Sequence, residues 1–103
     1  MPIEVELLDS TGDVMGRSPA KKVSKAYLNA HQWIYSAEVL IMQGGTIDLC
    51  VIYDEALPGG YAATQCPMHD GADVFTPYGP PVMRQGDNFT FTCTINFVRD
   101  DYA

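Results

Sequence analysis

The densest group of side chains that could bind a metal ion lies between residues 66 and 73. Cysteine, histidine and aspartate can bind zinc and other divalent cations, and this stretch contains Cys66, His69, Asp70 and Asp73. Zinc sites normally draw on two spaced groups of this kind, and the only other histidine is His31. We therefore expect a polar loop here, with neither a metal nor a cofactor.

Catalytic combinations are equally sparse. A cysteine nucleophile needs a base and a group that orients the base, and the only conceivable pairs join Cys66 to His31 or His69. The sequence has no Gly-x-Ser-x-Gly elbow and no glycine-rich phosphate cradle. We expect a protein that is not an enzyme. The alternative, a binder or enzyme with a barrel-like cup, would need a deep pocket lined by Trp33, Tyr35, Tyr53 or Tyr61.

Two segments are candidates for contact with another protein. Four of the six basic residues lie within nine positions, and all 13 acidic residues lie outside this cluster, which consists of Arg17, Lys21, Lys22 and Lys25. Such a cluster is either a solvated face or a docking patch for an acidic surface. The second candidate is the aromatic and proline-rich stretch that contains Phe75, Tyr78 and Pro80, because aromatic rings suit protein interfaces.

Length and charge limit the classes of protein and partner. A chain of 103 residues with 47% hydrophobic residues is typical of a single globular domain, here residues 1–103. The net charge of −7 argues against free nucleic acid as the main partner. No apolar run is long enough for a membrane helix, and the N-terminus does not resemble a secretory signal, so we expect synthesis in the cytoplasm. With three cysteines, at least one stays unpaired within the chain.

The N-terminal third predicts a strand, a turn and a short helix. Residues 3–8 alternate between apolar and polar side chains, and residues 9–13 have the composition of a turn. Ser18 and Pro19 suit a helix N-cap and first helical position, and Val23 and Tyr27 follow helical spacing, which predicts a helix over residues 19–31. A strand remains open, because Val23, Lys25 and Tyr27 also share one strand face.

The middle of the chain predicts a β-hairpin. Residues 32–42 are rich in aromatic and β-branched side chains, and residues 46–53 alternate, with Ile47, Leu49, Val51 and Tyr53 on one face. The Gln43-Gly44-Gly45 loop between them favours direct pairing of the two runs. Short strands are expected at residues 61–65, 73–76 and 82–84 of the turn-rich segment that follows.

The clearest strand pattern is at residues 89–97. Phe89, Phe91, Cys93, Ile95 and Phe97 alternate with threonines and Asn96, so we expect a strand at the centre of a sheet with its aromatic face in the core. The predicted fold is mainly β, a sandwich or barrel-like antiparallel sheet with one short N-terminal helix, and α+β is the alternative.

These features favour a non-enzymatic structural or assembly protein. A small viral (phage) virion or capsid-decoration subunit fits best, acting through contacts with its own copies or with another protein. The alternative is a small acidic inhibitor or adaptor that binds one host protein. The former would place the chain in a virion, and neither hypothesis includes a membrane.

Overall fold

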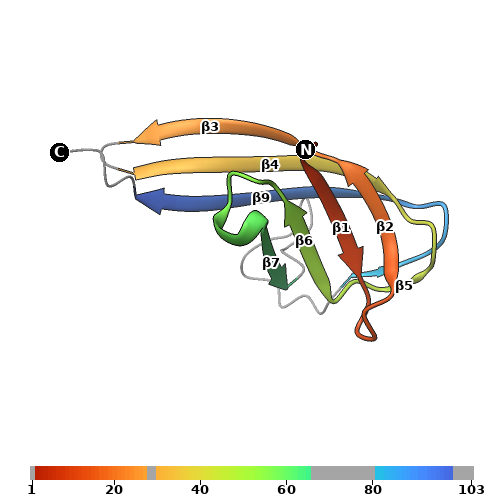
Figure 1. Cartoon of the computed structure of the whole chain (residues 1–103). Helices are drawn as coiled ribbons and strands as arrows, with labels where there is room; N and C mark the ends of the chain where they lie inside the picture. The colour runs from red at the N-terminus through yellow and green to blue at the C-terminus, as the bar shows by residue number, and fades with distance from the viewer. Residues whose placement is uncertain (1, 28–29, 66–80, 99–103) are drawn as a thin grey trace, which may run out of the picture.

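β-Strands make up most of the structure, a computed structural model that describes residues 2–27, 30–65 and 81–98 (Figure 1). In that part of the chain the strands are β1 (Glu4–Leu8), β2 (Val14–Pro19), β3 (Lys21–Tyr27), β4 (Ala30–Leu40), β5 (Gly45–Thr46), β6 (Leu49–Tyr53), β7 (Tyr61–Gln65), β8 (Val82–Met83) and β9 (Asn88–Val98). One short 3-10 helix, η1 (Pro58–Gly60), precedes β7. The predicted mainly β fold is confirmed.

The strands form two main sheets. One has the order β2-β1-β6-β7 and the other has the order β3-β4-β9, while β5 and β8 form a small third sheet. Neighbouring strands pair antiparallel in all of them. The ends of β3, β4 and β9 near Tyr27 and Ala30 project beyond the four-stranded sheet (Figure 1).

The hydrophobic core lies between the two main sheets. Val5 and Leu7 of β1 lie directly opposite Ile52 and Cys50 of β6, and all four side chains are fully buried. The facing sheet contributes four more buried residues, which are Tyr35, Val39, Phe89 and Phe91. Alternation in β1 therefore places the apolar residues Val5 and Leu7 on the core face, as the pattern of residues 3–8 predicted.

The predicted helix over residues 19–31 is wrong. Lys21–Tyr27 instead form β3, which pairs residue by residue with β4, from Lys21 opposite Ser36 to Tyr27 opposite Ala30. Helical spacing and strand alternation were both compatible with the apolar residues of this segment, and pairing with β4 decides between them. This pairing satisfies the backbone groups of β3 that face β4, and Lys22 points toward the four-stranded sheet.

The predicted hairpin is also wrong, although both of its runs are strands. β4 pairs with β3 and β9, whereas β6 pairs with β1 and β7 in the other sheet. Between them the chain crosses from one sheet to the other, with Ile41 and Ile47 buried at the crossing. A Cβ atom on Gly44 would lie 3.3 Å from the carbonyl oxygen of Met83, so the glycine allows close passage along β8 and does not mark a tight hairpin turn.

Leu49, Val51 and Tyr53 share one face of β6, as their alternation predicted, and this face is the outer one. Cys50 and Ile52 face the core and are fully buried, while Tyr53 faces outward with 38% of its surface exposed. Val51 is also buried, because on the outer face it lies between Glu6 of β1 and Ala63 of β7. The pairing of β6 with β1 fixes its register, which residues 46–53 alone did not determine.

The alternation at residues 89–97 is confirmed where the side chains are described. Phe89 and Phe91 are buried, Cys93 and Ile95 are half-buried, and Thr90, Thr92 and Thr94 are exposed. The expected central position is wrong, however. Within the described chain β9 is an edge strand, and β4 is the centre of its sheet.

A close contact at Gly16 joins the two sheets at one end. β2 leads into β3 through Ala20, and Gly16 packs against the last residues of β4. A Cβ atom on Gly16 would lie 2.6 Å from the carbonyl oxygen of Leu40 and 2.9 Å from a methyl group of Val39. The backbone of Met15 accepts a hydrogen bond from the amide of Met42 at 2.8 Å, which fixes this approach.

We therefore expect Gly16→Ala to lower the free energy of unfolding by about 1–3 kcal/mol, because the added methyl group forces the backbones of β2 and β4 apart. Urea denaturation of both proteins measures the difference. Val14→Ala in the same strand is the control, since Val14 is 43% exposed and its truncation should cost less than about 1 kcal/mol. Equal stability of Gly16→Ala and the native chain would contradict the close contact.

Candidate interaction surface

Arg17 pairs with the buried carboxylate of Glu6 on the outer face of the four-stranded sheet. It lies in β2 directly opposite Glu6 of β1. Its Nε donates to Oε2 of Glu6 at 3.0 Å and its Nη2 donates to the same oxygen, while the Tyr53 hydroxyl donates to Oε1 at 3.2 Å. Glu6 is only 6% exposed, and its hydrogen bond to Arg17 raises the pKa of the guanidinium. Part of the capacity of Arg17 to bind an acidic partner is thus already used within the chain.

Lys22 is the centre of a polar network between the two sheets. Its Nζ lies 2.8 Å from Oδ2 of Asp54, which also accepts a hydrogen bond from the Tyr35 hydroxyl at 2.6 Å. The amide of Ala56 donates to Oδ1 of Asp54 at 3.0 Å, and the Lys22 ammonium lies 4.0 Å from the centre of the Trp33 ring. The network connects β3 and β4 to the end of β6, so Lys22 acts as a structural residue.

The pKa values in this network follow from burial and hydrogen bonding. Burial alone would raise the pKa of Asp54, but the hydrogen bonds from Lys22, Tyr35 and the Ala56 amide outweigh burial and hold the pKa below its ordinary value. The pKa of Tyr35 is raised, first by burial and then by its hydrogen bond to the Asp54 carboxylate. Asp54 therefore stays charged at neutral pH, which keeps the ion pair with Lys22 intact.

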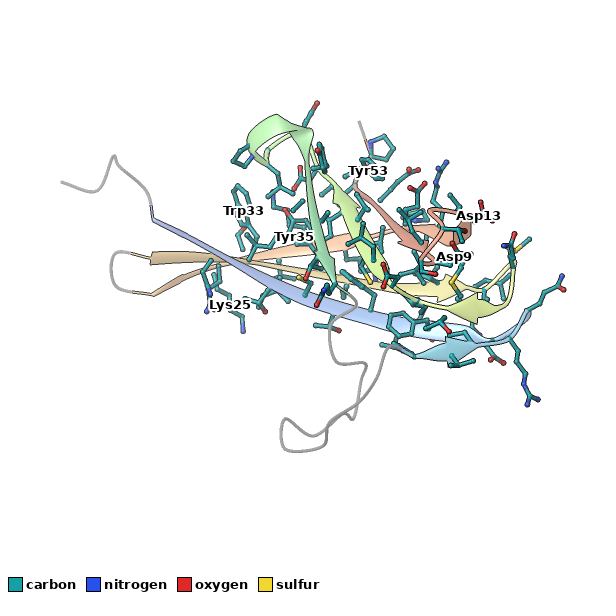
Figure 2. The ribbon with its side chains drawn as sticks, turned by 90° about the horizontal axis from the view of Figure 1, so that it is seen from below. Asp9, Asp13, Lys25, Trp33, Tyr35 and Tyr53 are labelled. Carbon is teal, nitrogen blue, oxygen red and sulfur yellow. The ribbon has the colours of Figure 1, made fainter. Side chains whose placement is uncertain are left out.

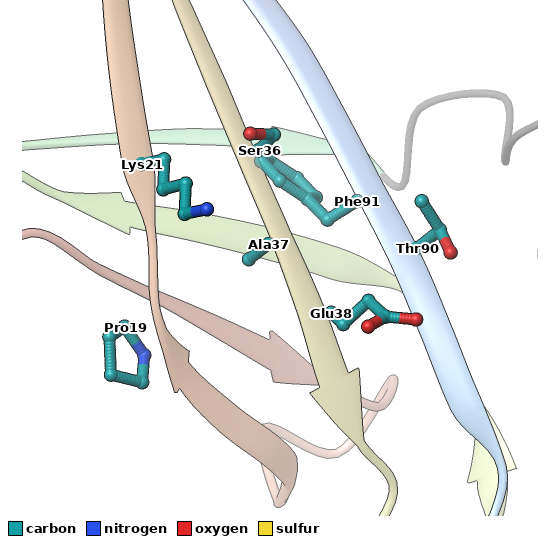
Figure 3. A pocket seen from close by; sticks show the side chains of 7 residues that line it. All are labelled: Pro19, Lys21, Ser36, Ala37, Glu38, Thr90 and Phe91. Carbon is teal, nitrogen blue, oxygen red and sulfur yellow. The ribbon is translucent and has the colours of Figure 1, made fainter.

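Lys21 and Lys25 are the exposed lysines of the basic cluster. Lys25 points away from the side that carries Trp33 and Tyr35 (Figure 2). Lys21 and Glu38 line an open pocket of about 320 Å³ on the three-stranded sheet (Figure 3). The structure thus divides the predicted patch, since Arg17 and Lys22 pair internally while Lys21 and Lys25 face solvent.

The other predicted contact residues lie outside the described residues. These are Phe75, Tyr78 and Pro80, together with the strand expected at residues 73–76 and with Cys66, His69, Asp70 and Asp73 of the weighed metal site. Within residues 2–27, 30–65 and 81–98 no three histidine, cysteine or acidic side chains gather as a metal site.

Cys93 is half-buried, and burial raises the pKa of its thiol.

The four aromatic rings considered for a binding pocket do not line one cavity. Tyr35 is fully buried between the sheets, and Trp33 is half-buried against the core. Tyr53 and Tyr61 lie on the outer face of the four-stranded sheet, with ring centres 6.4 Å apart. The rings are therefore divided between the inside of one sheet and the outside of the other.

The sequence alone did not indicate the surface around Tyr53. Tyr53, Glu4, Arg17 and Pro2 line an open pocket of about 270 Å³ on the outer face of the four-stranded sheet. Burial, followed by the nearby Glu6 carboxylate, raises the pKa of the Tyr53 hydroxyl. Alternation in residues 3–8 could have placed Glu4 and Glu6 on this face, but only the register of β6 brings Tyr53 beside them.

Comparison of the chain with protein families, curated proteins and solved structures finds no match. In the portion of the chain that the structure describes, no helix has the length and apolar character needed to cross a membrane.

Proposed function

We propose that this chain is a structural subunit that assembles with copies of itself, as the small subunits that build or decorate viral capsids do, and that it is not an enzyme. The observation that carries the proposal is the projecting end of the three-stranded sheet (Figure 1). An association of many copies would supply the contacts that the four-stranded sheet does not supply to this end.

Apolar side chains occupy both faces near this end. On the outer face Val23 of β3 lies directly opposite Ile34 of β4, and Val23 is 52% exposed. On the inner face Trp33 lies between Ser24 of β3 and Ile95 of β9, and both Trp33 and Ile95 are only partly buried. Sheets gain independent stability when such faces are packed against another layer, so a partner protein that covers this end would stabilise it.

Charge favours assembly over binding to nucleic acid. The net charge is −7, while Lys21 and Lys25 are exposed on the outer face of β3. Exposed lysines on an acidic body reduce the repulsion between two copies of the chain. A partner of the same charge pattern, namely a second copy, therefore fits this distribution.

The mass of the native chain in solution tests the proposal. We expect light scattering coupled to gel filtration, with sedimentation velocity from about 1 to about 100 µM protein, to give a multiple of the 11.3 kDa chain mass. A mass of 11.3 kDa at every concentration would contradict self-assembly. That result would favour the alternative of an acidic adaptor that binds one host protein.

A further inference from the structure

The two edges of the three-stranded sheet differ in their charge. β3 carries Lys21, Lys22 and Lys25 within seven residues. β9 carries no charged residue among its eleven, and it contains neither proline nor glycine. Charged side chains, and lysine in particular, are a common means of keeping an edge strand from pairing with another chain. β3 has this protection and β9 lacks it.

β9 is also long and regular. It pairs with β4 over eleven consecutive residues without a bulge, from Asn88 opposite Leu40 to Val98 opposite Ala30. Among the described strands none pairs with its other side. Thr90, Thr92, Thr94 and Asn96 are exposed beside that edge. A regular edge of this length presents a row of backbone donors and acceptors to any strand that can approach it.

We propose that β9 pairs antiparallel with β9 of a second copy, so that the two three-stranded sheets join into one six-stranded sheet. This inference rests on the proposed self-assembly and specifies its interface. Full overlap of the two strands would form about ten backbone hydrogen bonds, which is the number found in an ordinary protein–protein interface. The backbone thus supplies enough polar contacts for a specific dimer.

Charge selects β9 as the strand that meets its own copy. Two β3 strands would bring lysines close to lysines, and like charges on paired strands are destabilising. Two β9 strands would instead place threonine and asparagine side chains against each other on the outer face, and cross-strand threonine pairs are favourable. In a chain with a net charge of −7, this uncharged strand is where two copies approach with the least repulsion.

Two variants of opposite charge test the pairing. Thr92→Lys with Thr94→Lys places two lysines on the exposed face of β9, and Thr92→Glu with Thr94→Glu places two glutamates there. Across a two-fold axis each charge meets its own kind, so we expect each variant to raise the dissociation constant of the dimer at least about tenfold. An equimolar mixture of the two variants should recover the dimer, because opposite charges then face each other.

The matched control places the same charges on the edge of the other sheet. Ala63→Lys with Gln65→Lys has the same spacing on β7, where both residues are exposed, and should leave the dimer unchanged. Circular dichroism melts confirm that every variant is folded. If the native chain assembles and the β9 variants assemble equally well, the β9 pairing is wrong while self-assembly stands. Dissociation of the β7 variant in place of the β9 variants leads to the same conclusion. Open chains of increasing mass would show head-to-tail contacts and also overturn the two-fold pairing, whereas a monomeric native chain overturns both proposals.

Discussion

Replacing Asp54 with alanine is expected to lower the free energy of unfolding by about 3 kcal/mol. Asp54 is 6% exposed and accepts hydrogen bonds from Tyr35 and the Ala56 amide while it pairs with Lys22. Its removal leaves the Lys22 ammonium and the buried Tyr35 hydroxyl without their acceptor, and the loss of one partner from a buried ion pair costs about 3–5 kcal/mol. We place the loss at the lower limit because 17% of the Lys22 side chain remains accessible to water.

Two further variants separate the contributions within this network. Asp54→Asn keeps an acceptor of the same size but removes the negative charge, so it should cost less than alanine. Tyr35→Phe removes one hydrogen bond to a carboxylate, which is expected to cost about 1.5–3 kcal/mol. Urea denaturation followed by tryptophan fluorescence measures all three, since Trp33 packs beside Lys22. Unchanged stability of Asp54→Ala would show that the network does not hold the sheets together.

The contribution of Asp54 should depend on pH. The pKa of Asp54 in the folded chain is below its ordinary value of 3.8, so its stabilising effect is present above about pH 4. The effect is lost as the pH falls through the lowered pKa, because the carboxyl group must then be protonated in the folded chain. We therefore expect the difference in stability between the native chain and Asp54→Asn to be largest near pH 7 and to shrink below about pH 3. A difference that stays constant over this range would contradict the ion pair.

Phe91→Ala is expected to lower the free energy of unfolding by about 3–5 kcal/mol. Phe91 is fully buried between the two sheets, on the face of β9 that also carries Phe89. Removal of its ring loses apolar burial and leaves a cavity, because the residues packed around it can only partly relax. Thermal and urea denaturation of the two proteins measure the loss.

Thr90→Ala is the matched control for Phe91→Ala. Thr90 is the preceding residue of the same strand and is exposed on the opposite face. Its replacement should cost less than about 1 kcal/mol, since it changes β-propensity but no core contact. Similar losses for the two variants would show that alternation in β9 does not separate the core from the solvent.

The strand predictions that the structure confirms were made from the alternation of apolar and polar side chains. Residues 3–8 and 89–97 each form a strand, and Val5, Leu7, Phe89 and Phe91 of their alternating sets are buried in the core. The period of two is a local property of the chain, so it can be read without knowledge of the neighbouring strands. The helix expected over residues 19–31 failed because its few apolar residues fit both periods, and only β4 decided between them.

The interaction surface was harder to predict from the sequence, because it depends on ion pairs between residues that are distant in the chain. Lys22 and Asp54 are 32 positions apart, and only the packing of the two sheets brings them to 2.8 Å. Arg17 and Glu6 likewise meet through the register of β1 and β2. Nothing in the basic cluster alone distinguishes Arg17 and Lys22, which pair with carboxylates of the chain, from the exposed Lys21 and Lys25.

By itself the sequence determined that this chain forms a mainly β fold and which residues of β1 and β9 enter its core, because side-chain alternation and apolar burial are local. The tertiary structure decided which strands pair, which charges are neutralised within the chain and that β9 lies at an edge. Those outcomes depend on backbone hydrogen bonds and ion pairs between distant segments, whose partners are selected only when the two sheets pack together.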